Sequence, residues 1–464
     1  MASLLPHSLL LLFLTVASAG TIGVNYGRVA NNLPSPTSVV SLLKSHNISR
    51  VKLYDADPTV LRSLSNTSIR TTVTLPNELL ISAAISPSFA SKWVSLNISP
   101  YLPSTIIDTI SVGNEVFVDP RNLSSYLVPA MSNIHQALVN LSLDSSVKVS
   151  SPIALSALQS SYPPSSGSFK PDLAGTVIQP MLDFLRRTGS FLMVNAYPFF
   201  AYEANSDVIS LDYALFRPNP GVVDPGNGLR YFSLLDAQLD AVFAAMAALK
   251  YDDLRVVVTE TGWPSKGDAN ETGAGVDNAA AYNGNLVRRV LVSDLNTPRK
   301  PQADIDVYLF ALFNEDQKVG PTSERNYGLF YPDEEAVYQI AFTGGGGAGL
   351  SQVKAVVVRP PEAAEEVTTS SVGQTWCVAN GRAERGKLQR ALDYACGEGK
   401  ADCQAIQPGQ ACFDPNTIEA HASFAFNSYY QRNGRGVGTC DFDGAAYVVT
   451  QLPRFGRCEF TTGA

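Results

Sequence analysis

The chain has 464 residues, of which 45% are hydrophobic, and it carries a formal net charge of −8. Its length suits one large and one small domain, and the lack of any basic tract argues against nucleic acid or an anionic membrane as a partner. The sequence holds four histidines, and no cysteine precedes Cys377. A zinc site, a Cys–His pair or a Ser–His–Asp triad would therefore be hard to build in the N-terminal part. Carboxylates remain as its catalytic groups, and we expect neither a metal nor another cofactor.

Residues 1–19 have the pattern of a signal peptide, with an apolar core followed by the small residues Ala17-Ser18-Ala19. The apolar core is too short to cross a membrane. Behind it lie six Asn-X-Ser/Thr sequons, at Asn47, Asn66, Asn97, Asn122, Asn140 and Asn270. Six sequons after such a leader indicate a secretory route. The C-terminal CEFTTGA lacks the apolar tail of a lipid-anchor signal. We expect a protein outside the cell or in the cell wall, without a membrane anchor, and the vacuole stays open.

Short apolar and β-branched runs alternate with helical patterns from residue 21 to 313. We predict eight strands, at 21–27, 50–56, 70–76, 106–116, 147–153, 191–198, 254–261 and 305–313. The clearest helices between them are predicted at 36–45, 124–140, 231–249 and 278–292. This order predicts an α/β fold, a closed parallel (β/α)8 TIM barrel over residues 20–342. An open doubly wound sheet would also alternate, but no Gly-rich phosphate loop follows the first strand.

Connections after the predicted strands are uneven in length. The segments 155–175 and 199–230 are long and rich in Pro and Gly, whereas the connection from a helix to the next strand at 250–253 is short. Extra length therefore gathers at the end of the barrel where active sites occur. Long walls there predict a cleft that binds a polymer along its length.

The chain changes character after residue 342. GGGGAG and a stretch with Pro360 and Pro361 predict a flexible linker at 343–374. All six cysteines lie in the final part, 375–464, which predicts a small domain with three disulfides. Six cysteines allow 15 pairings, and spacing alone does not choose among them. Zinc is the alternative, but no paired CxxC spacing is present.

Two carboxylates stand where predicted strands end. Glu260 lies in VVVTETGWPSKG and Glu115 in VGNEV, and a third, Glu315, follows the last strand in FNEDQK. Strand ends of a barrel converge on its axis, so Glu115 and Glu260 would face each other. Each alone could be a structural carboxylate that caps a loop. Together they form the pair that glycoside hydrolysis needs, one protonated and one ionised.

Aromatic side chains gather at the same predicted strand ends. Sugar rings have apolar C–H faces that stack on such rings. Ordinary core packing is the alternative and should account for about half of them. The set comprises Tyr26, Tyr54, Tyr197, Phe199, Phe200, Trp263, Phe330 and Tyr331.

The stretch VVVTETGWPSKG closely resembles the signature of glycoside hydrolase family 17, the plant β-1,3-glucanases. IGVNYG, RVKLYDAD, VGNEV, NAYPFF, LFNEDQK and NYGLFYPD are similar to that family in the same order, over about residues 21–342. The resemblance implies a retaining endo-hydrolase of β-1,3-glucan on a (β/α)8 barrel. It implies Glu260 as the nucleophile and Glu115 as the general acid/base.

The same resemblance implies further site residues. Glu315, Lys318 and Glu324 would position the acid and hold sugar hydroxyls, although from composition Lys318 and Glu324 would pass as a solvated surface pair. Substrate contacts are implied for Tyr54, Asn114, Tyr197 and Phe330.

The C-terminal part is similar to carbohydrate-binding module family 43. WCVA at 376–379, the cysteine spacing and FNSYYQ at 426–431 carry this likeness. It implies binding to β-1,3-glucan. It also implies the disulfides Cys377–Cys440, Cys396–Cys403 and Cys412–Cys458.

Three functions stay open at this point. The first is a secreted endo-hydrolase of β-1,3-glucan, either callose or fungal wall glucan. The second is a non-hydrolytic wall protein that binds the same polymer. The third is a transglycosylase, because water and a sugar hydroxyl compete for the intermediate of a retaining enzyme. We expect a monomer.

Overall fold

The computed structural model describes residues 21–342 except 294, and residues 375–460 with gaps at 381–382, 384, 434, 436–438, 441, 443–444, 450–452, 454–457 and 459. The chain divides into two compact units, within residues 1–360 and 361–464. The predicted signal peptide at 1–19 and the predicted linker at 343–374 lie outside the described residues.

The N-terminal unit is built on one parallel sheet in the order β5-β4-β3-β2-β1-β13-β12-β9-β6. Its strands are β1 (Ile22–Tyr26), β2 (Arg50–Leu53), β3 (Arg70–Leu75), β4 (Ile106–Val112), β5 (Lys148–Ser150), β6 (Pro152–Ala154), β9 (Leu192–Asn195), β12 (Val256–Thr261) and β13 (Val307–Leu309). β5 pairs with β4 and β6 pairs with β9, and only Ser151 separates β5 from β6. The two edge strands are therefore halves of one interrupted strand, and the chain itself closes the ring. The predicted barrel is confirmed, with every strand at its predicted place.

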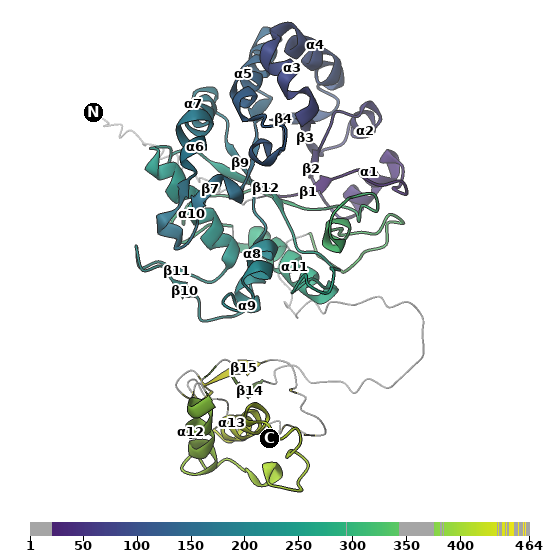
Figure 1. Ribbon diagram of the computed structural model, residues 1–464. Coiled ribbons are helices and arrows are strands. Elements are labelled where there is room, and N and C mark those ends of the chain that lie inside the picture. Colours follow the sequence, from purple (N-terminus) through teal and green to yellow (C-terminus); the bar gives the residue numbers. More distant parts are fainter. Residues whose placement is uncertain are drawn as a thin grey trace, which may run out of the picture. The chain divides into compact units, whose positions relative to one another are not determined.

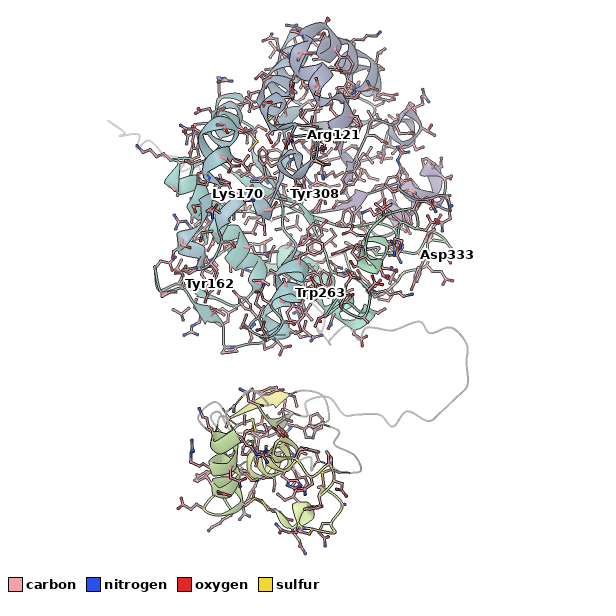
Figure 2. All side chains as sticks on the ribbon, viewed as in Figure 1. Arg121, Tyr162, Lys170, Trp263, Tyr308 and Asp333 are labelled. Carbon is pink, nitrogen blue, oxygen red and sulfur yellow. A yellow bond between two sulfur atoms is a disulfide. The ribbon has the colours of Figure 1, made fainter. Side chains whose placement is uncertain are left out.

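Helices surround the strands, as Figure 1 shows. They are α1 (Pro36–Ser45), α2 (Pro58–Ser63), α3 (Leu80–Ile85), α4 (Pro87–Asn97), α5 (Ser124–Asn140), α6 (Pro171–Leu173), α7 (Gln179–Thr188), α8 (Pro198–Ala204), α9 (Leu211–Ala214), α10 (Leu234–Ala248) and α11 (Val276–Ser293). Tyr308 of β13, which is 3% exposed, lies at the centre of the ring (Figure 2). The core thus fills the barrel, and an open end is left for a site.

Local sequence explains several helix starts. α1, α2 and α4 each begin with proline directly after a capping residue, in Ser-Pro, Asp-Pro and Ser-Pro pairs. Ser35 Oγ accepts a hydrogen bond from the amide of Ser38 at 3.2 Å, and Asp57 Oδ1 accepts one from Thr59 at 2.8 Å. Such caps satisfy the free N–H groups of the first turn, and proline already has the helical φ.

Both long connections have structure of their own. Residues 155–175 contain an antiparallel pair, β7 (Leu158–Ser160) and β8 (Ser168–Phe169). Residues 199–230 contain most of α8, all of α9, and β10 (Val222–Val223), which pairs with β11 (Arg230–Tyr231). The connections are therefore folded walls. Among the described helices, none is long and apolar enough to span a membrane.

In the C-terminal unit one helix packs against a two-stranded sheet and a second helix packs against the first. β14 (Trp376–Ala379) runs antiparallel to β15 (Ala446–Val449), and the helices are α12 (Arg385–Cys396) and α13 (Ile418–Arg432). The disulfides are Cys377–Cys440, Cys396–Cys403 and Cys412–Cys458, the pairing that the family resemblance implies.

Candidate active site

Glu260 lies near the carboxyl end of β12, where the register of that strand shifts against both neighbours. The residue is 5% exposed. Its Oε1 accepts hydrogen bonds from Lys52 Nζ at 2.6 Å and from the Tyr54 hydroxyl at 2.7 Å, and its Oε2 accepts one from the Tyr197 hydroxyl at 2.9 Å. Burial by itself raises the pKa of this carboxyl, but the charge of Lys52 and these hydrogen bonds outweigh it and lower the pKa. Glu260 is therefore held ionised.

Lys52, on β2, is the main electrostatic partner of Glu260, and the sequence prediction missed it. The residue is 0% exposed, and its Nζ also donates a hydrogen bond to Asn114 Oδ1 at 3.0 Å. The signal was visible in RVKL, where a lysine stands inside a buried strand. Such a lysine is costly to bury unless it has an anionic partner.

Glu115 follows β4 in a backbone conformation that is rare for a residue with a side chain. Its φ is 49° and its ψ is 44°, in the left-handed region. The amide of Glu115 donates to Pro152 O at 3.1 Å. Gly113 just before it has φ 71°, and a Cβ there would lie 2.5 Å from Val116 Cγ2. The motif VGNE thus turns the chain sharply and directs Glu115 into the site.

The carboxyl of Glu115 has a weaker set of partners than Glu260. Its Oε1 accepts a hydrogen bond from Asn195 Nδ2 at 2.8 Å, and Asn195 is fixed in turn by Thr259 Oγ1, which donates to its Oδ1 at 2.8 Å. Burial and the negative charge of Glu260 raise the pKa of Glu115. The two carboxyl groups therefore have pKa values shifted in opposite directions. This separation is what an acid and a nucleophile require.

Asn114 is held from both sides. Its amide N–H donates to Asn77 Oδ1 at 2.8 Å, and Asn77 Nδ2 donates to Asn114 O at 3.0 Å. The side chain then reaches Lys52. The tight turn before Glu115 is in this way tied both to β2 and to the loop after β3.

Glu315, Lys318 and Glu324 all reach the cleft. Glu315 is 2% exposed, and its Oε1 accepts a hydrogen bond from the amide of Val29 at 2.8 Å. Its Oε2 lies 3.4 Å from Lys318 Nζ, which itself lies 4.1 Å from the centre of the Phe310 ring. A Cβ at Gly27 would lie 2.4 Å from Glu315 Oε2, so glycine is required for this approach. Lys318 and Glu324 therefore do not form an isolated solvated surface pair.

A cleft of about 720 Å³ joins these groups at one end of the barrel. Tyr54, Tyr197, Phe200, Phe310 and Tyr327 supply its aromatic walls. The two long connections contribute Leu155, Ser156, Ser161, Phe200 and Ala201. No group of three or more His, Cys, Asp or Glu side chains in the described ranges could hold a metal ion.

Other predicted aromatics belong to the core. Phe330, which we expected to contact substrate, is 3% exposed, its ring packs against His46 at 4.7 Å, and it is not among the residues that line the cleft. The backbone of Phe330 forms bridges with Phe313 and Ala336, which hold this segment in place. Trp263 is also buried, and its ring contacts Phe199 and Tyr202 of α8 and Tyr282 of α11.

Comparison with known proteins agrees with this geometry. The sequence profile of glycosyl hydrolases family 17 matches residues 22–342. The chain belongs to this family. The profile of the X8 domain matches residues 375–447, so the resemblance to a family 17 barrel followed by this carbohydrate-binding module is confirmed.

Plant relatives align with nearly the whole length of this chain. Glucan endo-1,3-beta-glucosidase 12 of Arabidopsis thaliana is 43% identical over 463 residues, which are 97% of this chain and 86% of that protein. Glucan endo-1,3-beta-D-glucosidase of Olea europaea is 40% identical over 453 residues, which are 97% and 95% of the two chains. The solved structure of CJP38, a beta-1,3-glucanase and allergen of Cryptomeria japonica pollen, has a TM-score of 0.67 and 43% identity, and covers 70% of this chain and 100% of that one.

The X8 unit has a second, smaller cleft of about 360 Å³. Its lining combines two basic side chains, Lys387 and Arg390, with three aromatic rings, Tyr394, Tyr429 and Phe442. Tyr394 is 46% exposed, and its ring centre lies 6.1 Å from that of Tyr429 and 6.4 Å from that of Phe442. No carboxylate is among the described residues that line this cleft.

The six sequons differ in how their asparagines are placed. Asn47, Asn66, Asn122, Asn140 and Asn270 are exposed. Asn97 is half-buried in α4, and its Nδ2, the atom that a glycan would modify, donates to Trp93 O at 2.9 Å.

Proposed function

We propose that this protein hydrolyses internal β-1,3-glucosidic bonds of glucans, with retention of anomeric configuration. The observation that carries the proposal is the pair Glu115 and Glu260, whose pKa values are shifted in opposite directions within one cleft. The names of the relatives, glucan endo-1,3-beta-glucosidases and a beta-1,3-glucanase, support the substrate and the bond. A cleft walled by folded connections supports binding within a polymer.

In the first step, ionised Glu260 attacks the anomeric carbon of the sugar. Glu115 gives its proton to the glycosidic oxygen, which leaves as the hydroxyl of the departing chain. The products of this step are a glycosyl ester on Glu260 and an ionised Glu115. Lys52, Tyr54 and Tyr197 orient the Glu260 carboxylate before attack.

In the second step, the ionised Glu115 takes a proton from a water molecule as that water attacks the anomeric carbon. The ester bond breaks, and Glu260 regains its charge beside Lys52. Two inversions at one carbon restore the original configuration. Asn114, Glu315, Lys318 and Glu324 hold sugar hydroxyls along the cleft, and Tyr54 and Tyr197 offer ring faces as well as hydroxyls.

The test is Glu260→Gln and Glu115→Gln, assayed on linear β-1,3-glucan and on β-1,4-glucan by product size and by NMR of the anomeric form. We expect β-configured products from the first polymer only, and a loss of at least about 10³-fold for Glu260→Gln. Glu115→Gln should lose about 10²- to 10⁴-fold. Glu335→Gln, on the exposed surface, is the control and should be unchanged.

The pH profile is a second readout of the same pair. Glu260 must be ionised, so activity should fall as the pH drops through its lowered pKa. Glu115 must be protonated in the first step, so activity should fall as the pH rises through its raised pKa. Full activity of Glu260→Gln would rule out the assigned nucleophile. Binding without products would favour the wall protein, and products longer than the substrate would favour the transglycosylase.

The X8 unit, in this proposal, binds β-1,3-glucan through its aromatic cleft and keeps the barrel on insoluble polymer. Its three disulfides are typical of the secretory pathway, and we propose an extracellular or wall-bound protein with glycans on the exposed sequons. We also propose that the protein is a monomer. Size-exclusion chromatography with light scattering at working concentration tests that point.

A further inference from the structure

Gln238 of α10 is a buried amide that the fold does not use. It lines the barrel cleft and is 7% exposed, and its neighbours Leu234, Leu235 and Leu239 are buried too. Its Oε1 is shielded and has no hydrogen-bond partner among the described residues. Leaving a buried polar atom unpaired costs free energy, and the packing of α10 gains nothing from this amide oxygen.

The other amide atom of Gln238 is available to a ligand. Nε2 makes no hydrogen bond within the described part of the chain, and it is not one of the shielded unpaired atoms. It therefore meets the cleft, which Gln238 lines. An amide N–H₂ can donate two hydrogen bonds, and a sugar hydroxyl can accept one.

The surroundings of Gln238 fit a sugar ring. Ser156 and Ser161 line the same cleft, are exposed, and make no side-chain hydrogen bond to another described residue. Phe200 is 43% exposed, and its ring centre lies 5.4 Å from that of Tyr197. An exposed ring face with several polar groups around it is the usual composition of a carbohydrate subsite.

This part of the cleft lies apart from Glu315, Lys318 and Glu324. Ser156 and Ser161 belong to the connection after β6, and Phe200 to α8 after β9, whereas the three charged residues follow β13. In the sheet order β12 stands between β13 and β9. Tyr162, next to Ser161 in the chain, is 75% exposed and lies toward the periphery of the barrel (Figure 2). The connection after β6 therefore extends toward the outside of the barrel, on the side away from Glu315, Lys318 and Glu324.

We propose that Gln238, Ser156, Ser161 and Phe200 form a glucosyl-binding subsite beyond the bond that is cleaved, in which the Gln238 amide donates a hydrogen bond to a ring hydroxyl. This inference rests on the proposed function, because it names where the glucan chain continues. Gln238 is a specificity residue here and takes no part in the bond cleavage. Its contribution should appear only with substrates long enough to reach it.

The experiment is Gln238→Met, a change of similar volume without the amide, measured on β-1,3-gluco-oligosaccharides of increasing length. We expect kcat/KM to fall about 3- to 10-fold on the longer oligosaccharides, because one neutral hydrogen bond is lost. The shortest hydrolysed oligosaccharide should be cleaved as by the wild type. The melting temperature should stay equal or rise, since no hydrogen bond of the fold is removed. Gln159→Met, an exposed glutamine of the same wall that does not line the cleft, is the matched control.

Two results would overturn the subsite. One is unchanged kcat/KM at every length. The other is an equal loss at every length together with a lower melting temperature, which a structural role would give. Titration calorimetry in the Glu260→Gln background keeps this question separate from the proposed reaction. Weaker binding of the long oligosaccharide there supports the subsite even if the wild type proves not to hydrolyse it, and unchanged binding contradicts it.

Discussion

The two units of this chain reach stability by different means. The barrel has no cysteine, and a large continuous core is buried within it and beneath its helices. The X8 unit has a much smaller core and contains all six cysteines, each of them paired. A small domain buries a smaller share of its surface, so cross-links make up what the core does not supply.

The clefts of the two units also differ in the side chains that line them. The barrel cleft is lined by carboxylates, and a lysine buried beside it controls the charge of Glu260. The X8 cleft is lined mainly by aromatic and basic side chains, which can contact a sugar without being buried. Burial strengthens both the desolvation penalty and the effect of nearby charges on a pKa, and Glu260 in the barrel is only 5% exposed. We therefore assign the proposed chemistry to the barrel and the proposed adhesion to the X8 unit.

Among the variants that test this contrast, Lys52→Met should have the largest effect on folding free energy and on activity. Removing one partner of a buried ion pair costs roughly 3–5 kcal/mol of folding free energy, because Glu260 would stay buried without its cation. Activity should also fall roughly 10- to 150-fold, the value of a hydrogen bond to a charged group. Burial would then dominate and raise the pKa of Glu260, so the acidic limb of the pH profile should move to higher pH. Thermal unfolding and kcat/KM against pH measure the two effects.

Lys92→Met, at an exposed lysine of α4, is the control for Lys52→Met and should change neither quantity. The double variant Lys52→Met with Glu260→Gln should recover part of the lost stability, because it leaves no buried charge. An unmoved acidic limb in Lys52→Met would contradict the role of Lys52.

Cys377→Ser with Cys440→Ser should affect the X8 unit and spare the barrel. The disulfide spans 63 residues, and opening a loop of this length removes about 4 kcal/mol by the chain-entropy relation. We expect binding to insoluble glucan to be lost, while activity on soluble glucan stays. Cys396→Ser with Cys403→Ser, whose disulfide spans 7 residues, should cost only about 2 kcal/mol. Loss of soluble activity in either pair would show that the units do not fold independently.

The contrast also explains what the sequence could predict. Strands of the barrel were visible because buried parallel strands are continuous apolar runs, and Glu115 and Glu260 were visible because they end such runs. The break at Ser151 was not visible in the sequence, because it depends on how β5 pairs with β4 and β6 pairs with β9. Folded structure inside the long connections was likewise hidden by their Pro and Gly content.

Site residues inside elements were harder to find than those at strand ends. Lys52 stood out as a lysine within a strand, but its partner lies 208 residues away in sequence. Asn195 and Gln238 carry no local signal, because amides are common on helices and strands. Phe330 misled because an aromatic near a strand end can face the cleft or the core, and only its packing against His46 in the folded chain shows which.

Tyr394→Ala makes the smallest change and tests the X8 cleft directly. The ring is 46% exposed, so its removal should leave the folded unit intact. Stacking of one sugar ring on an aromatic face contributes about 0.5–1.5 kcal/mol, so binding to insoluble β-1,3-glucan should weaken roughly 2- to 12-fold. Tyr447→Ala, on β15 and 52% exposed but outside the cleft, is the matched control. Equal effects of the two variants on binding in a depletion assay would mean that the adhesive surface lies elsewhere on the X8 unit. An unchanged rate on soluble glucan would still separate adhesion from the chemistry of the barrel.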